Sequence, residues 1–349
     1  MRRHTAALLA AAMMAVLAAG NAGMIYANAD NVMIYSGGTA FQQGPGPGVS
    51  ETAAAGPINI GEAPEAAVQP AGSAAASSDV SAAASAAAAG ETVTKNGYRN
   101  GDRIGLNSSW QFAEYSAIHT GEAVMYTAAA NRKNKVIGVN AGHGTKGGES
   151  VKTFCHPDGT PKLTGGSTRA GAVKATAVSS GMTFNDGTPE RIVTLQMAQI
   201  LKEKLLAEGY DVLMIRDGED VQLDNIARSV IANNTADCHI ALHWDGDGLS
   251  YDKGVYYMSV PDGLKSMEPV KSCWQAHEAL GNALIGGLKA KGLKVWGSNP
   301  LDTDLTQTSY STVPSVDIEL GNQRSDHSAE RLALEADGLV LGINAFFGF

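Results

Sequence analysis

The sequence predicts an α/β domain of about six strands, preceded by a long segment that cannot build a core. From residue 135 onward, short β-favouring stretches alternate with longer helix-like stretches, which is the pattern of an α/β fold. Residues 37–90 consist mostly of Ala, Gly, Pro and Ser, so they offer too little bulky apolar surface to offset the entropy of ordering. The 349-residue chain is therefore expected to divide unevenly, into segments 1–29, 30–92, 93–134 and 135–349.

Residues 1–29 have the features of an export signal. A basic start precedes the apolar run Ala6–Ala19, and Ala27-Asn28-Ala29 matches the A-x-A pattern at which signal peptidase cuts. An uncleaved membrane anchor is the alternative, because apolar character continues to Tyr26 and a span needs about 20 such residues. The polar break at Gly20 and Asn21 favours cleavage, so we expect an exported protein of the cell envelope or the extracellular space. Contact with a membrane is expected only through an uncleaved signal.

Residues 30–92 are expected to form a flexible linker, and residues 93–134 a small lead-in segment. No Lys or Arg occurs between Arg3 and Lys95, and the few charges in that stretch are acidic. The lead-in has a less readable pattern than the rest of the domain, and a small segment rich in β-structure is expected there.

Charge and cysteine content argue against nucleic-acid binding and against a metal cluster held by cysteine thiolates. The net charge of −9 comes without a basic block, so nucleic acid is not expected as a partner. The three cysteines lack the C-x-x-C spacing of a thiolate metal cluster, and they allow at most one disulfide. They are Cys155, Cys238 and Cys273.

Strands and helices are expected in alternation along the domain. Runs rich in β-branched and apolar residues predict strands at Val136–Asn140, Asp211–Ile215, Cys238–Leu242, Gly254–Ser259 and Val316–Leu320, with another short strand near Lys294–Trp296. Longer periodic stretches predict helices at Pro189–Ala207, Leu223–Asn233, within Pro269–Lys291 and at Ala329–Phe346. For the first helix, Thr188 is expected as N-cap, Pro189 as the first helical residue and Gly209 as the stop.

Two histidines and a glutamate are expected at one edge of this sheet, because ligands of α/β folds collect beyond the carboxyl ends of the strands. His143 follows the first strand within Gly-His-Gly, and His243 ends the third strand. Glu190 begins the first helix and shares its apolar, sheet-facing stripe. Two imidazoles and a carboxylate that leave a fourth position for water are typical of a catalytic zinc site. The alternatives are a histidine at the tip of a tight turn and an acid favoured by the helix dipole.

Glu319 is the candidate for a carboxylate that moves protons without binding metal. It lies in "VDIELGN", where a β-favouring run enters a glycine, so it also emerges at a strand's carboxyl end. A zinc hydrolase needs such a group to take a proton from water and return it to the leaving amine. Asp317 shares its face by the period of two, and a solvated acid at the sheet edge is the alternative reading.

The other histidines are weaker candidates. His239 and His243 are four residues apart, as in the motif H-E-x-x-H, but Ile240 stands where that motif has glutamate. His239 is therefore expected in the core or next to the ligands, and His156 is a poorer ligand candidate in a polar loop. Surface or core positions are expected for His119, His277 and His327.

Four stretches, taken in order, resemble one family. They are "VNAGHG", "TPERIVTLQMAQILKEKLLAEGYDVLMIRD", "IALHWDG" and "VPSVDIELGN". Together they resemble the zinc-dependent N-acetylmuramoyl-L-alanine amidases, the cell-wall hydrolases of the amidase 3 family, over residues 135–349. The resemblance implies one Zn²⁺ held by His143, Glu190 and His243, with Glu319 as the catalytic glutamate. It also implies a single catalytic domain with a mixed, mostly parallel sheet flanked by helices. The implied substrate is peptidoglycan, cleaved between N-acetylmuramic acid and the L-alanine of the stem peptide.

The sequence departs from the family's pattern at two places. Asn140 and Ala141 stand where the family commonly has Asp-Pro, and the segment 144–187 is longer than the usual loop. A loop of this length between two ligands is expected to border the cleft and to govern substrate access or regulation. Two other functions are open: a zinc peptidase acting within the stem peptide, and a non-enzymatic wall-binding or regulatory domain. The sequence indicates neither a wall-binding module nor a protein activator.

Overall fold

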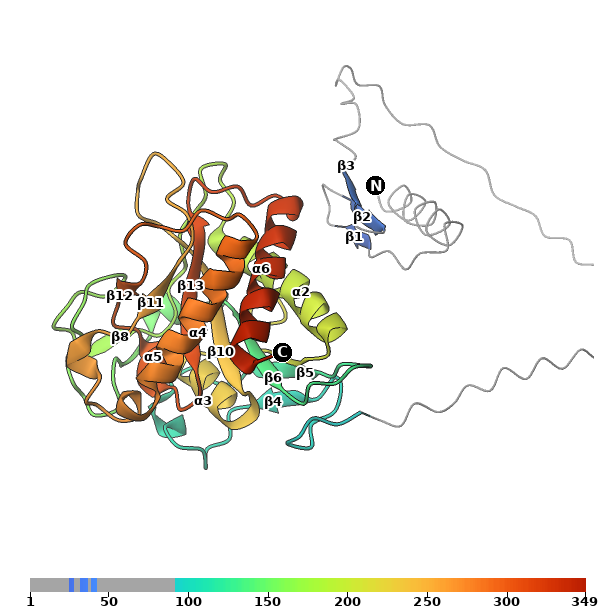
Figure 1. Cartoon of the computed structure of the whole chain (residues 1–349). Coiled ribbons are helices and arrows are strands. Elements are labelled where there is room, and N and C mark those ends of the chain that lie inside the picture. The colour runs from blue at the N-terminus through green and yellow to red at the C-terminus, as the bar shows by residue number, and fades with distance from the viewer. Residues whose placement is uncertain (1–24, 28–31, 37–38, 43–91) are drawn as a thin grey trace, which may run out of the picture. The chain divides into compact units, whose positions relative to one another are not determined.

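The computed structural model describes residues 25–27, 32–36, 39–42 and 92–349, and the chain divides into two units, residues 1–88 and 89–349 (Figure 1). In the first unit, β1 (Ile25–Ala27), β2 (Val32–Ser36) and β3 (Thr39–Gln42) form an antiparallel sheet. No strand is expected there from the sequence. The rest of the expected signal and linker lies outside the described residues. Among the described helices, none has the length and apolar character of a membrane span.

The second unit is built on an eight-stranded sheet with the order β12-β11-β13-β10-β6-β9-β5-β4. The strands are β4 (Arg103–Gly105), β5 (Glu122–Tyr126), β6 (Val136–Ala141), β9 (Asp211–Met214), β10 (Cys238–Asp245), β11 (Tyr256–Ser259), β12 (Leu301–Asp302) and β13 (Ser315–Asn322). The central strands β13, β10, β6 and β9 are parallel to one another, whereas β11 pairs antiparallel with β13 and β5 pairs antiparallel with β9. This confirms the mixed, mostly parallel α/β sheet.

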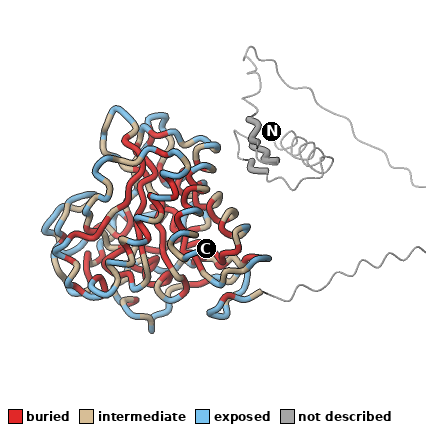
Figure 2. The backbone as a smooth tube through the Cα atoms, viewed as in Figure 1, coloured by how far each residue is buried: buried red, intermediate tan, exposed pale blue. Residues whose placement is uncertain are grey.

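Helices cover both faces of this sheet. The helices α2 (Glu190–Glu208), α4 (Val270–Ala290) and α6 (Ala329–Phe347) pack on one face, where they share a large apolar core with β6, β10 and β13 (Figure 1). The helix α3 (Asn225–Thr235) packs on the other face and contacts the short helix α5 (Thr306–Tyr310). The central strands are buried between these layers (Figure 2). Residues of one strand therefore alternate between two different cores.

The segment 144–187 connects β6 to α2 and contains secondary structure of its own. It contains the short 3₁₀ helix η2 (Gly148–Ser150) and a two-stranded antiparallel sheet, formed by β7 (Lys152–Phe154) and β8 (Lys174–Thr176). Two further 3₁₀ turns lie elsewhere in the unit, at η1 (Ala113–Tyr115) and η3 (Asp262–Leu264).

Several expectations about elements need correction. The segment 93–134 supplies β4 and β5 to the main sheet, so its expected β-structure is part of the fold of this unit. Residues 294–296 make only an isolated bridge to Val255, and the edge strand β12 lies further along. Thr188 does not cap α2: Pro189 holds that position without a side-chain bond, while Thr188 is engaged in a turn with Asp186. The stop at Gly209 is confirmed by its left-handed φ of 96°.

Candidate active site

His143 is presented by the loop that follows β6. Its backbone has a φ of 63°, which is costly for a residue with a side chain. Its ring Nδ1 lies 2.9 Å from the carbonyl oxygen of Ser179, in the segment between β6 and α2. A proton on Nδ1 donated to this oxygen leaves the lone pair on Nε2, which is the arrangement found behind metal-bound histidines. His143 is therefore oriented to use Nε2 as a ligand.

Glu190 is the first residue of α2 and is almost fully buried. Its Oε2 accepts a 2.8 Å hydrogen bond from the backbone N–H of Met182, and its Oε1 accepts one of 3.1 Å from the N–H of Trp244. Burial alone would raise the pKa of this carboxyl group, but the adjacent His143 and His243 outweigh burial and hold the pKa well below its usual range. Glu190 is therefore an ionised carboxylate fixed by main-chain donors.

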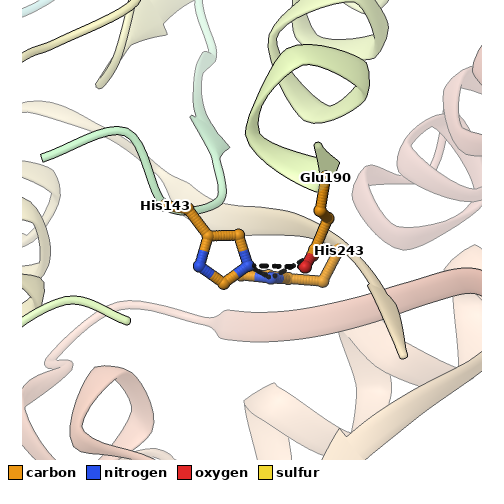
Figure 3. A group of neighbouring side chains, drawn as sticks. All are labelled: His143, Glu190 and His243. Atoms are coloured by element: carbon orange, nitrogen blue, oxygen red, sulfur yellow. Dashed lines mark hydrogen bonds and ion pairs between the residues drawn. The ribbon is translucent and has the colours of Figure 1, made fainter. Parts of the chain in front are cut away.

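The three predicted ligands meet at one point (Figure 3). His143 Nε2 lies 2.9 Å from Glu190 Oε2, and His243 Nδ1 lies 3.0 Å from Glu190 Oε1. The two ring nitrogens are 3.1 Å apart. Zinc bonds of about 2.0–2.2 Å in a tetrahedron bring ligand atoms to roughly 3.3 Å from each other. The spacing and the donor types therefore fit Zn²⁺.

The position of His243 depends on a glycine. A Cβ at Gly142 would lie 2.2 Å from His243 Cε1, so only a glycine leaves room for the ring against this backbone. On the other side, His243 Nε2 lies 3.7 Å from Asp317 Oδ2. The sequence identified Asp317 only as a neighbour of Glu319, whereas the structure places its carboxylate behind the ring of His243.

Glu319 stands beside this cluster on β13, in register with His243 on the parallel strand β10. Its side chain is buried, and its Oε2 has no hydrogen-bond partner among the described residues. Burial, followed by the charges of Asp317 and Glu190, raises the pKa of Glu319 well above its ordinary value. A carboxyl group with a raised pKa and an unused oxygen suits proton transfer near neutral pH.

Two buried arginines lie beneath the His143 loop, and the sequence analysis missed both. Arg228 on α3 donates to the carbonyl oxygens of Ala141 and His143, at 3.1 and 2.6 Å. Arg216 donates to the carbonyl oxygens of Ala141 and Gly142, at 3.1 and 3.0 Å. Three consecutive carbonyl groups are thereby fixed by guanidinium donors.

These arginines have no carboxylate partner within ion-pair distance among the described residues. Burial lowers the pKa of Arg216 to about 10 and that of Arg228 to about 9, so both remain charged at neutral pH. Burial of a guanidinium group without a carboxylate partner costs folding free energy unless its N–H groups donate hydrogen bonds. The hydrogen bonds to the loop carbonyls meet that requirement.

The remaining histidines lie away from the cluster. His156 is fully buried and bonds to Ser309 Oγ and Asp304 Oδ2, at 2.9 and 3.1 Å, so it joins the segment 144–187 to the region of α5. His239 and His277 are buried beside Ser315. His327 pairs with Asp186 and His119 with Ser116, both near the surface. The three cysteines, all in the described part of the chain, are free thiols.

The segment 144–187 reaches the cluster at its carboxyl-terminal end. Ser179 contacts the ring of His143, and Met182 contacts Glu190. A Cβ at Gly181 would lie 2.7 Å from His143 and 2.9 Å from Glu190 Oε2. The segment therefore borders the site as expected, although a role in substrate access is still a prediction.

Comparison with known proteins identifies the family. The sequence model of the family Amidase_3, described as N-acetylmuramoyl-L-alanine amidase, matches residues 137–338. The chain belongs to this family. The protein is accordingly a peptidoglycan hydrolase that cleaves the amide bond between N-acetylmuramic acid and L-alanine. The family and the amidase activity expected from the four sequence stretches are confirmed.

Solved structures with similarity to the chain include three N-acetylmuramoyl-L-alanine amidases. Ami1 of Mycobacterium abscessus is 20% identical, with 62% of this chain and 99% of that chain covered and a TM-score of 0.48. Ami1 of Mycobacterium smegmatis is 20% identical, with coverage of 63% and 99% and a TM-score of 0.49. The amidase of Clostridium difficile 630 is 15% identical, with coverage of 63% and 98% and a TM-score of 0.45. No match was found among curated proteins.

Proposed function

We propose that the protein is a zinc-dependent amidase in which His143, Glu190 and His243 bind the metal and Glu319 is the general base and acid. The observation that supports this most directly is the convergence of two imidazole nitrogens and a buried carboxylate within hydrogen-bond distance of one another. Each of these groups is held by contacts of its own, so the ligand set needs little reorganisation to bind an ion.

Each residue of the proposed site has a separate role in hydrolysis. Bound Zn²⁺ would supply Lewis-acid polarisation of the scissile carbonyl group and would lower the pKa of a water molecule. Glu319 takes a proton from the attacking water and delivers it to the nitrogen of the departing L-alanine. Asp317 holds the ring of His243 from behind. His143 is held more closely, by the hydrogen bond of its Nδ1 to the carbonyl oxygen of Ser179.

We further propose that the protein acts outside the cytoplasmic membrane after export. The basic start, apolar run and A-x-A pattern of residues 1–29 support export. The substrate, peptidoglycan, lies in the same compartment.

Zinc content and muropeptide digestion test the proposal together. The wild-type protein should contain about one Zn²⁺ and should release an intact peptide that begins with free L-alanine, as seen by mass spectrometry. His143→Ala, Glu190→Ala and His243→Ala should each lower zinc content and turnover, whereas the exposed His119→Ala should lower neither.

The same digest separates the alternatives. Cuts within the stem peptide would identify a zinc peptidase. Wall binding by zinc-replete protein, without release of any peptide, would identify a non-enzymatic domain. Full zinc content in the three ligand variants would refute the assigned metal site.

A further inference from the structure

A pocket of about 320 Å³ lies at the carboxyl ends of β10 and β13. Its walls come from three loops: residues 182–185 before α2, residues 246–249 after β10 and residues 323–324 after β13. Each loop adjoins an element that carries a residue of the proposed site, namely Glu190, His243 and Glu319. The pocket is therefore assembled by the same elements as the site.

The pocket wall touches a proposed metal ligand directly. The backbone N–H of Met182 donates to Glu190 Oε2, as described above, and the side chain of Met182 lies against Gly246, where a Cβ would approach to 3.0 Å. Met182 therefore belongs both to the pocket wall and to the surroundings of Glu190.

Gln323 ties the three loops together. Its backbone oxygen accepts a hydrogen bond from Asn185, its N–H donates to Asp245, and its side-chain Nε2 donates to the carbonyl oxygen of Leu249. The side-chain Oε1 of Gln323 is buried and has no hydrogen-bond partner in the described part of the chain. Gln323 therefore fixes the pocket walls through its backbone groups and its side-chain Nε2.

Arg324 gives the pocket its charge. It is the one charged side chain among the described residues that line the pocket. It is exposed, and its guanidinium makes no ion pair with the described residues. The nearby acid Asp247 is occupied by Lys253, at 3.0 Å, and by Asn322, at 3.1 Å. The cation is therefore available to an anionic ligand.

We propose that this pocket binds the free α-carboxylate of the second residue of the stem peptide, on the leaving-group side of the scissile amide. In peptidoglycan the residue after L-alanine is a glutamate linked through its γ-carboxyl group, so its α-carboxyl group is either free or amidated. That group lies roughly 7 Å from the scissile nitrogen in an extended chain. Arg324 pairs with the carboxylate. This assignment rests on the proposed function and deepens it.

Two product peptides test the pocket without requiring hydrolysis. They are L-Ala-γ-D-Glu-L-Lys-amide, with the glutamate α-carboxyl group either free or amidated, and their affinity for the full-length, zinc-loaded protein is measured by calorimetry. The wild type should bind the free acid about tenfold more tightly. Arg324→Ala should remove this preference by weakening only the acid, and Arg324→Lys should keep part of it. Arg103→Ala, at an exposed arginine on the far edge strand β4, should behave like the wild type.

Hydrolysis of the corresponding muramoyl peptides, measured in parallel, separates this assignment from the proposed function. Equal affinity for the two product peptides, or a preference that survives in Arg324→Ala, overturns the assignment whether or not the protein is active. An Arg324-dependent preference supports the pocket even if neither muramoyl peptide is cleaved, and the absence of cleavage would count against the amidase mechanism alone.

Discussion

Substitution of Gly142 by alanine is expected to damage the metal site while leaving the fold intact. The added Cβ would lie 2.2 Å from His243 Cε1, whereas ordinary contacts begin at 3.4 Å, so the ring must move by about 1.2 Å. The φ of Gly142 is not in the left-handed region, so the alanine backbone itself is unstrained. Zinc sites tolerate about 0.2 Å in ligand distance, and a misplacement of about 1 Å costs on the order of 10²-fold in rate. We therefore expect zinc affinity to fall by about 10- to 100-fold, with a similar or larger loss of kcat/KM.

The assay is competition for zinc against a fluorescent chelator, together with thermal unfolding of the metal-free protein. Gly286→Ala is the matched control, because Gly286 is an exposed residue of α4 with no atom near the position of a Cβ. This control should keep the wild-type zinc affinity and gain about 0.5–1 kcal/mol of stability. Wild-type zinc affinity and turnover in folded Gly142→Ala would refute the assignment of His243 as a ligand fixed against this glycine.

Three other predictions concern proton transfer, pH and the N-terminal segment. Glu319→Gln should lower turnover by about 10²- to 10⁴-fold with unchanged zinc stoichiometry; loss of zinc instead would make Glu319 a ligand. Burial raises the pKa of Glu335 to about 8 despite its bond to Arg331, so the folded state binds the proton more tightly than the unfolded state. As the pH rises from about 4.5 to 8, this residue should therefore lower the unfolding free energy by about 1.4 kcal/mol per pH unit. Glu335→Gln should remove that slope in urea titrations at several pH values, and an identical slope in the variant would contradict the burial argument. Deletion of residues 37–90 should leave kcat/KM on soluble muropeptides unchanged, because their composition supplies no part of a core; a large loss would show that the linker takes part in catalysis.

The fold of the domain was largely predictable because its central strands are buried on both faces. Short, mostly apolar stretches such as Val136–Ala141 therefore indicate strands without tertiary information. The convergence of His143, Glu190 and His243 was predictable from one rule, that the carboxyl ends of parallel strands meet at one edge. The short edge strands β4 and β12 were not, because two or three residues carry no readable periodicity.

The groups that support the site were harder to predict than the ligands themselves. Arg216 and Arg228 donate hydrogen bonds to carbonyl groups that lie 74 to 87 residues away in sequence. Because every residue has a backbone carbonyl group, the sequence does not show which of them will accept such a bond. In "MIRDGED" the first of them reads as an ordinary surface cation. The position of Asp317 behind His243, in contrast, could have been found from the period of two on β13.

The hydrogen bonds from Arg216 and Arg228 have a consequence for the order in which the protein folds and acquires metal. Three successive carbonyl groups, at residues 141–143, are anchored to guanidinium groups that are themselves buried in the domain. The loop that carries the first ligand is thus shaped by the polypeptide and not by an ion. Binding of the proposed Zn²⁺ would then add stability by mass action to a chain that is already folded. We therefore expect the chain to fold without the ion, and we expect removal of zinc by a chelator to be reversible without unfolding.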